Sequence, residues 1–218
     1  MPTIEPLTTS ILTIMYFGDV VFAVSGALTA ARHKMDVIGC VLIGAITGIG
    51  GGTTRDLLLG RTVWWTENPT ELILCVVAAV TTYFWAASKH KPKKGAVWAD
   101  ALGLAAFGVV GCHIALVFGA PFVIAVFMGM VTATGGGVIR DMITNTTPMI
   151  MSGQLYATAA LLGSVIYASL ISMGVGEIPS EVVAFGAAFS LRAWAILWDV
   201  RMGPPNEFIR IGGRGAGR

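Results

Sequence analysis

The chain has 218 residues, of which 55% are hydrophobic and only 12% are charged, and its mean hydropathy is +0.77. Soluble domains carry about 25% charged residues because charge must face water, so this composition excludes an ordinary soluble domain. The formal net charge of +2 is too small for a nucleic-acid binding surface. Three cysteines in separate apolar stretches predict neither a disulfide framework nor a metal cluster. A protein that crosses the membrane several times remains.

The apolar stretches predict seven membrane spans, since about 20 apolar residues cross a bilayer core of roughly 30 Å. The short connections between them hold charged residues, proline or glycine. The tail after the last span is polar and rich in glycine, and we expect it to be flexible. In chain order, the expected spans cover residues 9–31, 36–60, 69–88, 96–115, 119–144, 152–173 and 179–200.

Basic residues predict the orientation in the inner (plasma) membrane. Ten Lys and Arg residues fall on one side of the expected spans, and Arg61 alone falls on the other. Because short cytoplasmic loops carry an excess of Lys and Arg, the ten mark the cytoplasmic side. The N-terminus is then outside and the C-terminus inside.

An internal repeat is the most informative feature of the sequence. A shift of 85 residues aligns 13 identical residues within the 39 positions from 18 to 56 without a gap. It places one Gly-Gly-Gly-x-x-Arg-Asp segment, 50–56, on another, 135–141. Each copy holds three spans, so the second copy enters the membrane from the opposite face.

The repeat predicts an all-α membrane protein with seven transmembrane helices, arranged as an inverted 3+3 repeat plus one helix. Inverted repeats place a permeation or binding site near the bilayer midplane, between the copies. The expected divisions are a first repeat at 1–95, a second at 96–174, a seventh helix at 175–200 and a flexible cytoplasmic tail at 201–218.

The two glycine triplets are the expected pore hinges. Glycine lowers helix stability by about 1 kcal/mol relative to alanine, so three in succession predict a break or kink in the second and fifth helices. New half-helices would begin at Thr53 and Val138, and released backbone carbonyls would hold a monovalent cation near Gly50, Gly51, Gly135 and Gly136. The hinge residues are Gly50, Gly51, Gly52, Gly135, Gly136 and Gly137.

Charged residues within the spans mark the expected pore lining or gate. Each costs at least about 2.5 to 3.5 kcal/mol at a helix centre unless it is paired or hydrated. Because adjacent residues on a helix diverge by about 100°, we expect each arginine to pair with the aspartate of the other repeat. Such pairs serve either as a gate or as structural staples. The expected lining comprises Asp19, Thr53, Arg55, Asp56, Thr134, Arg140 and Asp141.

Asp19 differs from the other charges in the spans because Leu104 occupies the matching position of the second repeat. An asymmetric carboxylate in a symmetric cavity is a candidate for attracting a cation. The second repeat instead has Asp100, one helical turn earlier, opposite Met15.

Four segments carry a family resemblance: Phe22–Gly26, Gly50–Asp56, Asp100–Phe107 and Gly135–Asp141. They resemble the bacterial and archaeal branch of the trimeric intracellular cation channel (TRIC) family, whose bacterial sequences also carry a glycine transporter domain label. The resemblance implies a homotrimer in membrane lipid. Each subunit would have its own hourglass pore, bounded by the kinked second and fifth helices and passing K⁺ and Na⁺. Met15 stands where the family often has aspartate.

Two transport functions remain open at this point. A channel needs a continuous hydrated path, whereas a secondary transporter of glycine or another small amino acid needs a closed site that alternates. A non-transporting membrane scaffold is a third possibility. No P-loop, nucleophile elbow or zinc motif is present in the sequence, so we expect neither an enzyme nor a cofactor.

Overall fold

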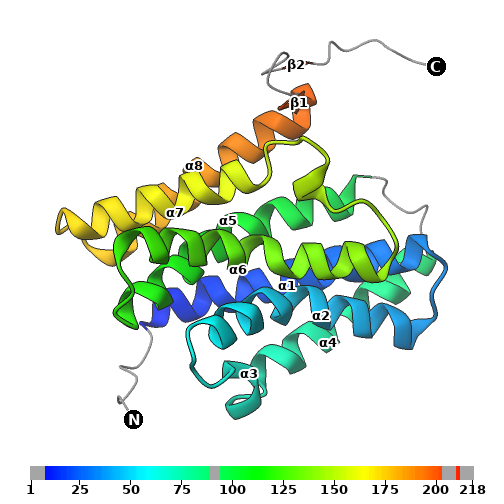
Figure 1. Ribbon diagram of the computed structural model, residues 1–218. Helices are drawn as coiled ribbons and strands as arrows, with labels where there is room; N and C mark the ends of the chain where they lie inside the picture. The colour runs from blue at the N-terminus through cyan, green and yellow to red at the C-terminus, as the bar shows by residue number, and fades with distance from the viewer. Residues whose placement is uncertain (1–7, 89–93, 203–209, 212–218) are drawn as a thin grey trace.

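In a computed structural model of the chain, residues 8–88, 94–202 and 210–211 are described. This part of the chain forms a bundle of α-helices (Figure 1). The helices lie within a few residues of the expected spans, and the short α3 is an addition. The elements are α1 (Thr9–Arg32), α2 (Val37–Leu58), α3 (Trp64–Glu67), α4 (Thr70–Ser88), α5 (Gly95–Val117), α6 (Phe122–Ile143), the 3₁₀ helix η1 (Met149–Met151), α7 (Ala157–Ser172), α8 (Glu177–Trp198), β1 (Val200–Arg201) and β2 (Arg210–Ile211).

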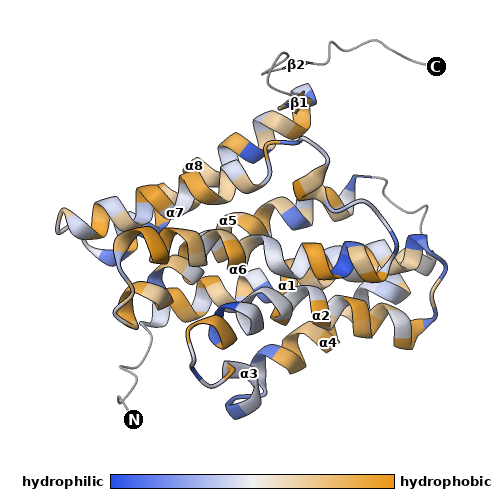
Figure 2. Ribbon diagram, in the orientation of Figure 1, coloured by the Kyte–Doolittle hydropathy of each residue, from blue (hydrophilic) through white to orange (hydrophobic). Residues whose placement is uncertain are grey.

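Five of the helices are long and apolar enough to cross a membrane, namely α1, α2, α5, α6 and α8. The apolar stretches of α4 and α7 are shorter. Figure 2 shows hydrophobic residues along the outer surfaces of these helices. Large apolar side chains are exposed there, such as Leu42 of α2, Phe127 of α6 and Val182 of α8, as expected for surfaces that face lipid or another subunit.

Local signals in the sequence set the helix ends. The Asp36 side chain caps α2 by accepting a hydrogen bond of 2.8 Å from the N–H of Gly39. Gly119, with a φ of 85°, follows the end of α5 and turns the chain toward α6. Only glycine takes such a left-handed conformation without a Cβ penalty, so the helix ends where the sequence places this residue.

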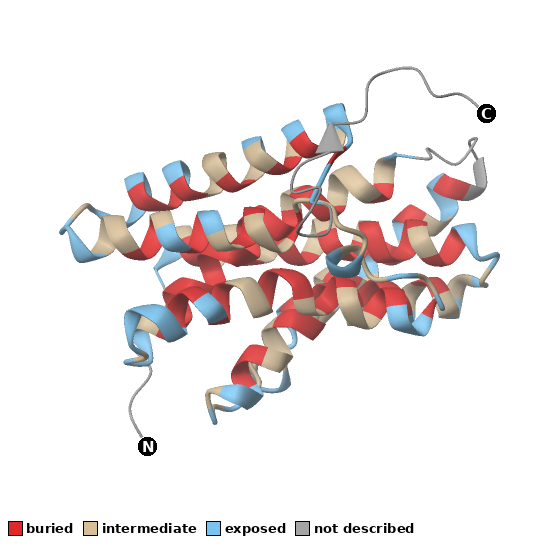
Figure 3. Ribbon diagram, turned by 45° about the horizontal axis from the view of Figure 1, so that its top comes forward, coloured by how far each residue is buried: buried red, intermediate tan, exposed pale blue. Residues whose placement is uncertain are grey.

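The two halves of the chain pack in antiparallel fashion around the centre. Gly18 of α1 lies against Phe107 of α5, while Phe22 lies against Gly103. Both contacts map onto each other when the repeats are exchanged, because 18 matches 103 and 22 matches 107. The two phenylalanine rings stack with centroids 5.4 Å apart. Figure 3 shows the buried residues concentrated along the facing sides of the central helices.

The tail lies mostly outside the described residues. Its expected flexibility concerns 203–209 and 212–218, which the description does not cover. The described ends form a two-stranded antiparallel ladder in which Val200 is opposite Ile211. In addition, the N–H of Met202 donates to the carbonyl of Gly153 at 2.6 Å, so the first residues after α8 are held against the loop before α7.

Candidate functional site

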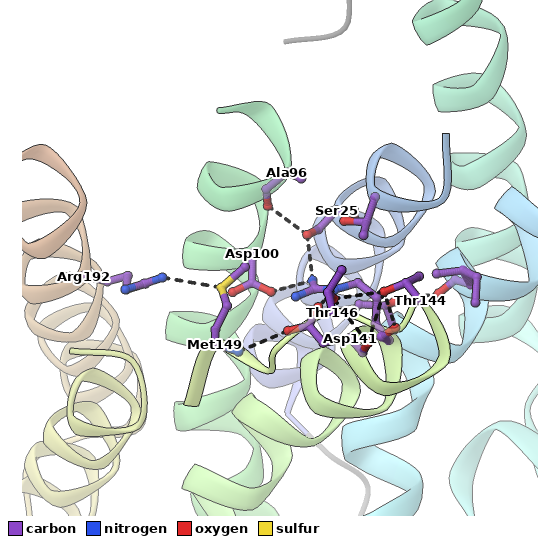
Figure 4. Close-up of polar contacts among 12 residues, drawn as sticks. Ser25, Ala96, Asp100, Asp141, Thr144, Thr146, Met149 and Arg192 are labelled. Carbon is purple, nitrogen blue, oxygen red and sulfur yellow. Dashed lines mark hydrogen bonds and ion pairs between the residues drawn. The ribbon is translucent and has the colours of Figure 1, made fainter. Parts of the chain in front are cut away.

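Arg140 is the centre of a buried polar cluster in the second repeat. Figure 4 labels its partners Ser25, Asp100 and Asp141. Its side chain lies in the last turn of α6 and is only 1% exposed. The Nη1 atom donates to Asp100 Oδ1 of α5 at 2.7 Å and to Ser25 Oγ of α1 at 3.0 Å. The Nε atom donates to Asp141 Oδ1 at 2.8 Å. One guanidinium therefore joins three helices.

Asp141 extends this cluster into the loop that follows α6. Its Oδ2 atom accepts a hydrogen bond from the N–H of Met149 at 3.2 Å, and its carbonyl accepts one from the N–H of Thr146 at 2.8 Å. Figure 4 shows both residues folding back toward the aspartate. The carboxylate thus fixes the return loop while it neutralises the arginine.

Arg192 is a second buried guanidinium beside the same cluster. It comes from α8, is fully buried, and donates from Nη2 to Gln154 Oε1 at 2.9 Å. Its Cζ atom lies 5.1 Å from the centre of the Tyr156 ring. Among the described residues, its Nε and Nη1 atoms, the Tyr156 hydroxyl and Asp100 Oδ2 have no hydrogen-bond partner. These groups are polar enough to bind water in a closed space.

The first repeat has a matching cluster at the end of α2. Arg55 donates from Nε and Nη2 to Asp56 Oδ1 at 2.9 and 2.7 Å. Asp56 Oδ2 accepts from the N–H of Trp64 at 3.1 Å, and Arg61 Nε approaches Asp56 Oδ1 to 3.6 Å. Burial lowers the pKa of Arg61, although the attraction of Asp56 acts in the opposite direction. Arginine remains charged under either influence.

The two clusters obey the 85-residue shift. Arg55 and Asp56 match Arg140 and Asp141, and Trp64 matches Met149 in donating its N–H to the aspartate. The helices α2 and α6 are antiparallel, since Gly51 meets Thr132 and Gly136 meets Thr47. Each cluster lies near the C-terminal end of its own helix, so the two clusters lie toward opposite ends of the bundle. Glu71, however, matches Tyr156, so the two clusters differ in charge.

The expected pairing between repeats, Arg55 with Asp141 and Arg140 with Asp56, is wrong. Each arginine instead contacts the aspartate that follows it in the chain. The divergence of adjacent side chains on a helix does not prevent this, because the long arginine side chain can fold back toward its neighbour. The aspartate is also held in place by the N–H groups of the return loop. Neither arginine therefore forms an ion pair with the Arg-Asp segment of the other repeat.

The glycine triplets do not break their helices. Both α2 and α6 run as uninterrupted α-helices through the glycines, so the expected half-helices beginning at Thr53 and Val138 are wrong. Nor are the carbonyls simply released, because Thr53 Oγ1 donates to the carbonyl of Ile49 at 2.8 Å. Thr54 Oγ1 donates to the carbonyl of Gly50 at 2.9 Å in the same way. The Thr134 hydroxyl donates to the carbonyl of Met130, which lies one turn before the second triplet.

The glycines instead allow α2 and α6 to cross with their backbones in contact. A Cβ on Gly51 would collide with the carbonyl oxygen of Thr132, and one on Gly136 would collide with that of Thr47. A Cβ on Gly135 would lie only 3.3 Å from the Cα of Gly51. Without a side chain at these positions, the helices approach as in other small-residue membrane contacts.

The third glycine of each triplet faces the charged cluster of its own repeat. A Cβ on Gly137 would lie 2.7 Å from the Tyr156 hydroxyl and 3.5 Å from Asp100 Oδ1. A Cβ on Gly52 would lie 3.7 Å from Arg55 Nη2. The expected site residues thus fall into a crossing and two flanking clusters, with Gly50 at the crossing, where its ideal Cβ lies 3.5 Å from the Gly136 Cα.

Asp19 lies in α1 and is 1% exposed. Its Oδ2 atom has no hydrogen-bond partner among the described residues. It interacts electrostatically with Glu71 and Arg55, which places it with the first cluster. Sequence reasoning missed Glu71, Tyr156, Gln154 and Ser25. The repeat offered a signal for one pair, because Glu71 and Tyr156 occupy matching positions.

Comparison with known proteins identifies the family. The sequence model described as "Glycine transporter" matches the chain twice, at residues 12–87 and 97–172. A solved structure described as the TRIC trimeric intracellular cation channel orthologue from Rhodobacter sphaeroides is 42% identical, with a TM-score of 0.85, over 88% of this chain and 100% of that one. The chain belongs to the prokaryotic TRIC family.

Further matches support the assignment of this chain to the TRIC family. A prokaryotic TRIC channel crystallised in 0.5 M KCl is 29% identical, with a TM-score of 0.83, over 88% of this chain and 98% of that chain. The UPF0126 inner membrane protein YadS of Escherichia coli K12 is 35% identical over 191 residues, which cover 85% of this chain and 91% of that protein. Together with its apolar helices, these matches make the chain a multi-pass protein of the inner membrane with the TRIC fold.

Proposed function

We propose that the protein is a monovalent cation channel that conducts K⁺ and Na⁺ through one pore in each subunit. The observation that carries this proposal is the glycine crossing of α2 and α6 between two buried Arg-Asp clusters. Ionisable residues within membrane-spanning segments are rare and mark substrate and ion pathways, among other functional sites. The likeness to a cation channel of 42% identity supports the same function.

The crossing corresponds to a closed pore. Backbone contact at Gly51 and Gly136 leaves no room for an ion between α2 and α6. Opening then requires the two helices to bend or separate at the glycine triplets, where a helix bends most easily. In the open state, carbonyls beside Gly50, Gly51, Gly135 and Gly136 would face the ion, since each carbonyl has a second lone pair beyond its helical bond.

The proposed architecture contains seven membrane helices, with α4 and α7 spanning although their apolar stretches are short. The first repeat comprises 1–95, the second 96–174, the seventh helix 175–200 and the tail 201–218. Antiparallel contacts that exchange under the 85-residue shift support the inverted arrangement. The excess of basic residues on one side supports an N-terminus outside and a C-terminus in the cytoplasm.

The proposed assembly is a homotrimer in membrane lipid. Apolar residues remain exposed on the outer faces of α2 and α6, including Leu42, Leu57, Val123 and Phe127. Subunit contacts or lipid would cover them. The description of the Rhodobacter sphaeroides relative as trimeric supports a three-fold assembly of this chain.

Reconstitution tests the proposed function. In planar bilayers with symmetric KCl, we expect unitary current steps that persist when Na⁺ replaces K⁺ and vanish when N-methyl-D-glucamine replaces both. Liposomes from the same preparation would be tested for uptake of labelled glycine. Saturable glycine uptake without current steps would overturn the channel and identify a secondary transporter.

A further inference from the structure

The two clusters differ in formal charge although the repeat relates their positions. The first contains three carboxylates, Asp19, Asp56 and Glu71, with the guanidiniums of Arg55 and Arg61. The second contains Asp100 and Asp141 with Arg140 and Arg192, and is neutral. Counted over the buried side chains with every acid ionised, the first cluster therefore has a formal excess of one negative charge. One bound monovalent cation would make both clusters neutral.

Asp19 and Glu71 carry this excess. Asp19 is 1% exposed and Glu71, at the beginning of α4, is 7% exposed. Glu71 repels the Asp19 carboxylate, and Arg55 attracts both acids. Glu71 is also attracted by Arg61 and repelled by Asp56. The α4 helix is held at this level of α1 by Cys75, whose Sγ donates to the carbonyl of Asp19 at 3.7 Å. The two carboxylates thus belong to one region between α1, α2 and α4.

The guanidinium of Arg55 does not neutralise both acids. Its Nε and Nη2 atoms bind Asp56, and its Nη1 atom is buried without a hydrogen-bond partner. Within the described residues neither Asp19 nor Glu71 forms an ion pair within 4.0 Å. Asp19 Oδ2 is buried and has no hydrogen-bond partner in that part of the chain. An unpaired buried carboxylate oxygen is costly, so a ligand that neutralises it is favoured.

We propose that Asp19 and Glu71 form a binding site for one monovalent cation. This site rests on the proposed channel function, to which it adds the place where a permeating ion exchanges water for carboxylate oxygens. A divalent ion is a poorer match, because the formal excess in the first cluster is only one negative charge. Among the residues that the structure describes, there is no group of three or more acidic, histidine or cysteine side chains for a metal ion.

The matching positions of the second repeat hold no acidic residues. Leu104 replaces Asp19, and Tyr156 replaces Glu71. The remaining carboxylate there, Asp100, binds Arg140 at 2.7 Å. Arg192 adds a positive charge beside it. The cation site is therefore expected in the first cluster only.

Unfolding of the purified full-length protein in detergent tests the site without measuring current. Thermal midpoints are compared in KCl and in N-methyl-D-glucamine chloride at constant ionic strength. A ligand that binds only the native state raises its stability with concentration. We expect K⁺ to raise the midpoint of the wild type, and Asp19→Asn or Glu71→Gln to shift the K⁺ dependence at least about tenfold in concentration.

Without K⁺, the same two variants should be no less stable than the wild type. Neutralising one acid removes carboxylate repulsion and the cost of burying a charge. The control is Glu177→Gln, which removes an exposed carboxylate from the beginning of α8, outside the first cluster, and should leave the K⁺ dependence unchanged. If a neutral variant does not fold, Glu71→Asp can be measured in its place. It retains the negative charge and should weaken K⁺ binding only a few-fold.

An unchanged K⁺ dependence in both neutral variants would overturn the site. The site would also be overturned by a wild type whose stability depends on pH but not on K⁺, because a shared proton would then be the occupant. Bilayer currents separate this site from the proposed function. Currents without carboxylate-dependent stabilisation by K⁺ overturn the site alone, whereas stabilisation without currents overturns the channel alone.

Discussion

Two fully buried arginines of the second cluster have different electrostatic roles. Arg140 forms ion pairs with Asp100 and Asp141, whereas Arg192 binds the amide of Gln154 and the ring of Tyr156. Removing a charge that neutralises two carboxylates leaves both of them unpaired in a dry interior. Arg192 has no ion pair within 4.0 Å among the described residues, so its removal takes away the hydrogen bond to Gln154, a weak contact with Met149 Sδ and a longer-range attraction to Asp100.

The first prediction compares Arg140→Met with Arg192→Met. We expect Arg140→Met to lower the free energy of unfolding by about 3 to 5 kcal/mol, as for other broken buried ion pairs. Arg192→Met should cost about 1.5 to 3 kcal/mol, because one hydrogen bond from a charged donor to a neutral amide is lost. Reversible denaturation in detergent measures both. Equal losses would mean that Arg192 also neutralises a carboxylate.

The second prediction is a double-mutant cycle on Arg140 and Asp100, with Arg140→Gln and Asp100→Asn. Their contact of 2.7 Å is almost wholly buried, so we expect a coupling above about 1 kcal/mol in stability. Asp199 and Arg201 provide a control, because their ion pair is about half exposed and should couple by less than about 1 kcal/mol. A larger coupling between Arg140 and Asp56 would restore the pairing between repeats that the structure contradicts.

At the scale of the element, the crossing of α2 and α6 depends on the absence of side chains. The third prediction is that Gly51→Ala or Gly136→Ala destabilises the protein by about 1 to 3 kcal/mol, because the new methyl group meets a backbone carbonyl that cannot rotate away. Gly186→Ala in α8 is the control. Its Cβ would meet nothing within 4 Å, so it should be neutral or slightly stabilising.

Single-channel recording of the same variants separates packing from pore opening. The proposed channel predicts fewer or shorter openings for Gly51→Ala and Gly136→Ala, because the crossing must separate for an ion to pass. Wild-type stability in either variant would contradict the backbone contact. Wild-type currents from a folded Gly51→Ala, Gly136→Ala double variant would instead show that opening does not involve this crossing.

Hydropathy was sufficient to locate the elements, but the contacts of individual side chains were beyond it. The positions of α1, α2 and α4 to α8 follow from apolar length, and the repeat follows from two doublets 85 residues apart. The partner of Arg140, Asp100, could not be found from the repeat, because Met15 stands at its matching position. The role of Gly51 was also misjudged, since a glycine that bends a helix and one that admits a neighbour look alike in a sequence.

At the scale of the whole molecule, the antiparallel packing of the halves requires that they enter the membrane from opposite faces. Gly18 against Phe107 and Phe22 against Gly103 fix opposite directions for α1 and α5. If α1 and α5 both cross the bilayer, an odd number of spans must separate their starting points. The three helices α1, α2 and α4 satisfy this condition only if the shorter α4 spans the membrane.

The last prediction is therefore the topology, measured with reporters whose activity differs between the two sides. A reporter after Met1 should be active outside, one within 89–93 in the cytoplasm, and one after Arg218 in the cytoplasm. Together with Arg32 and Lys34, the basic residues of the second and last positions favour that side by ten to one over the other connections. A control reporter within 60–63 should be active outside.

If the reporters at 60–63 and 89–93 were on the same side, α4 would not span, and the opposite entry of the two repeats would need another explanation. If those after Met1 and Arg218 were on the same side, the number of spans would be even, and a seventh membrane helix would be excluded.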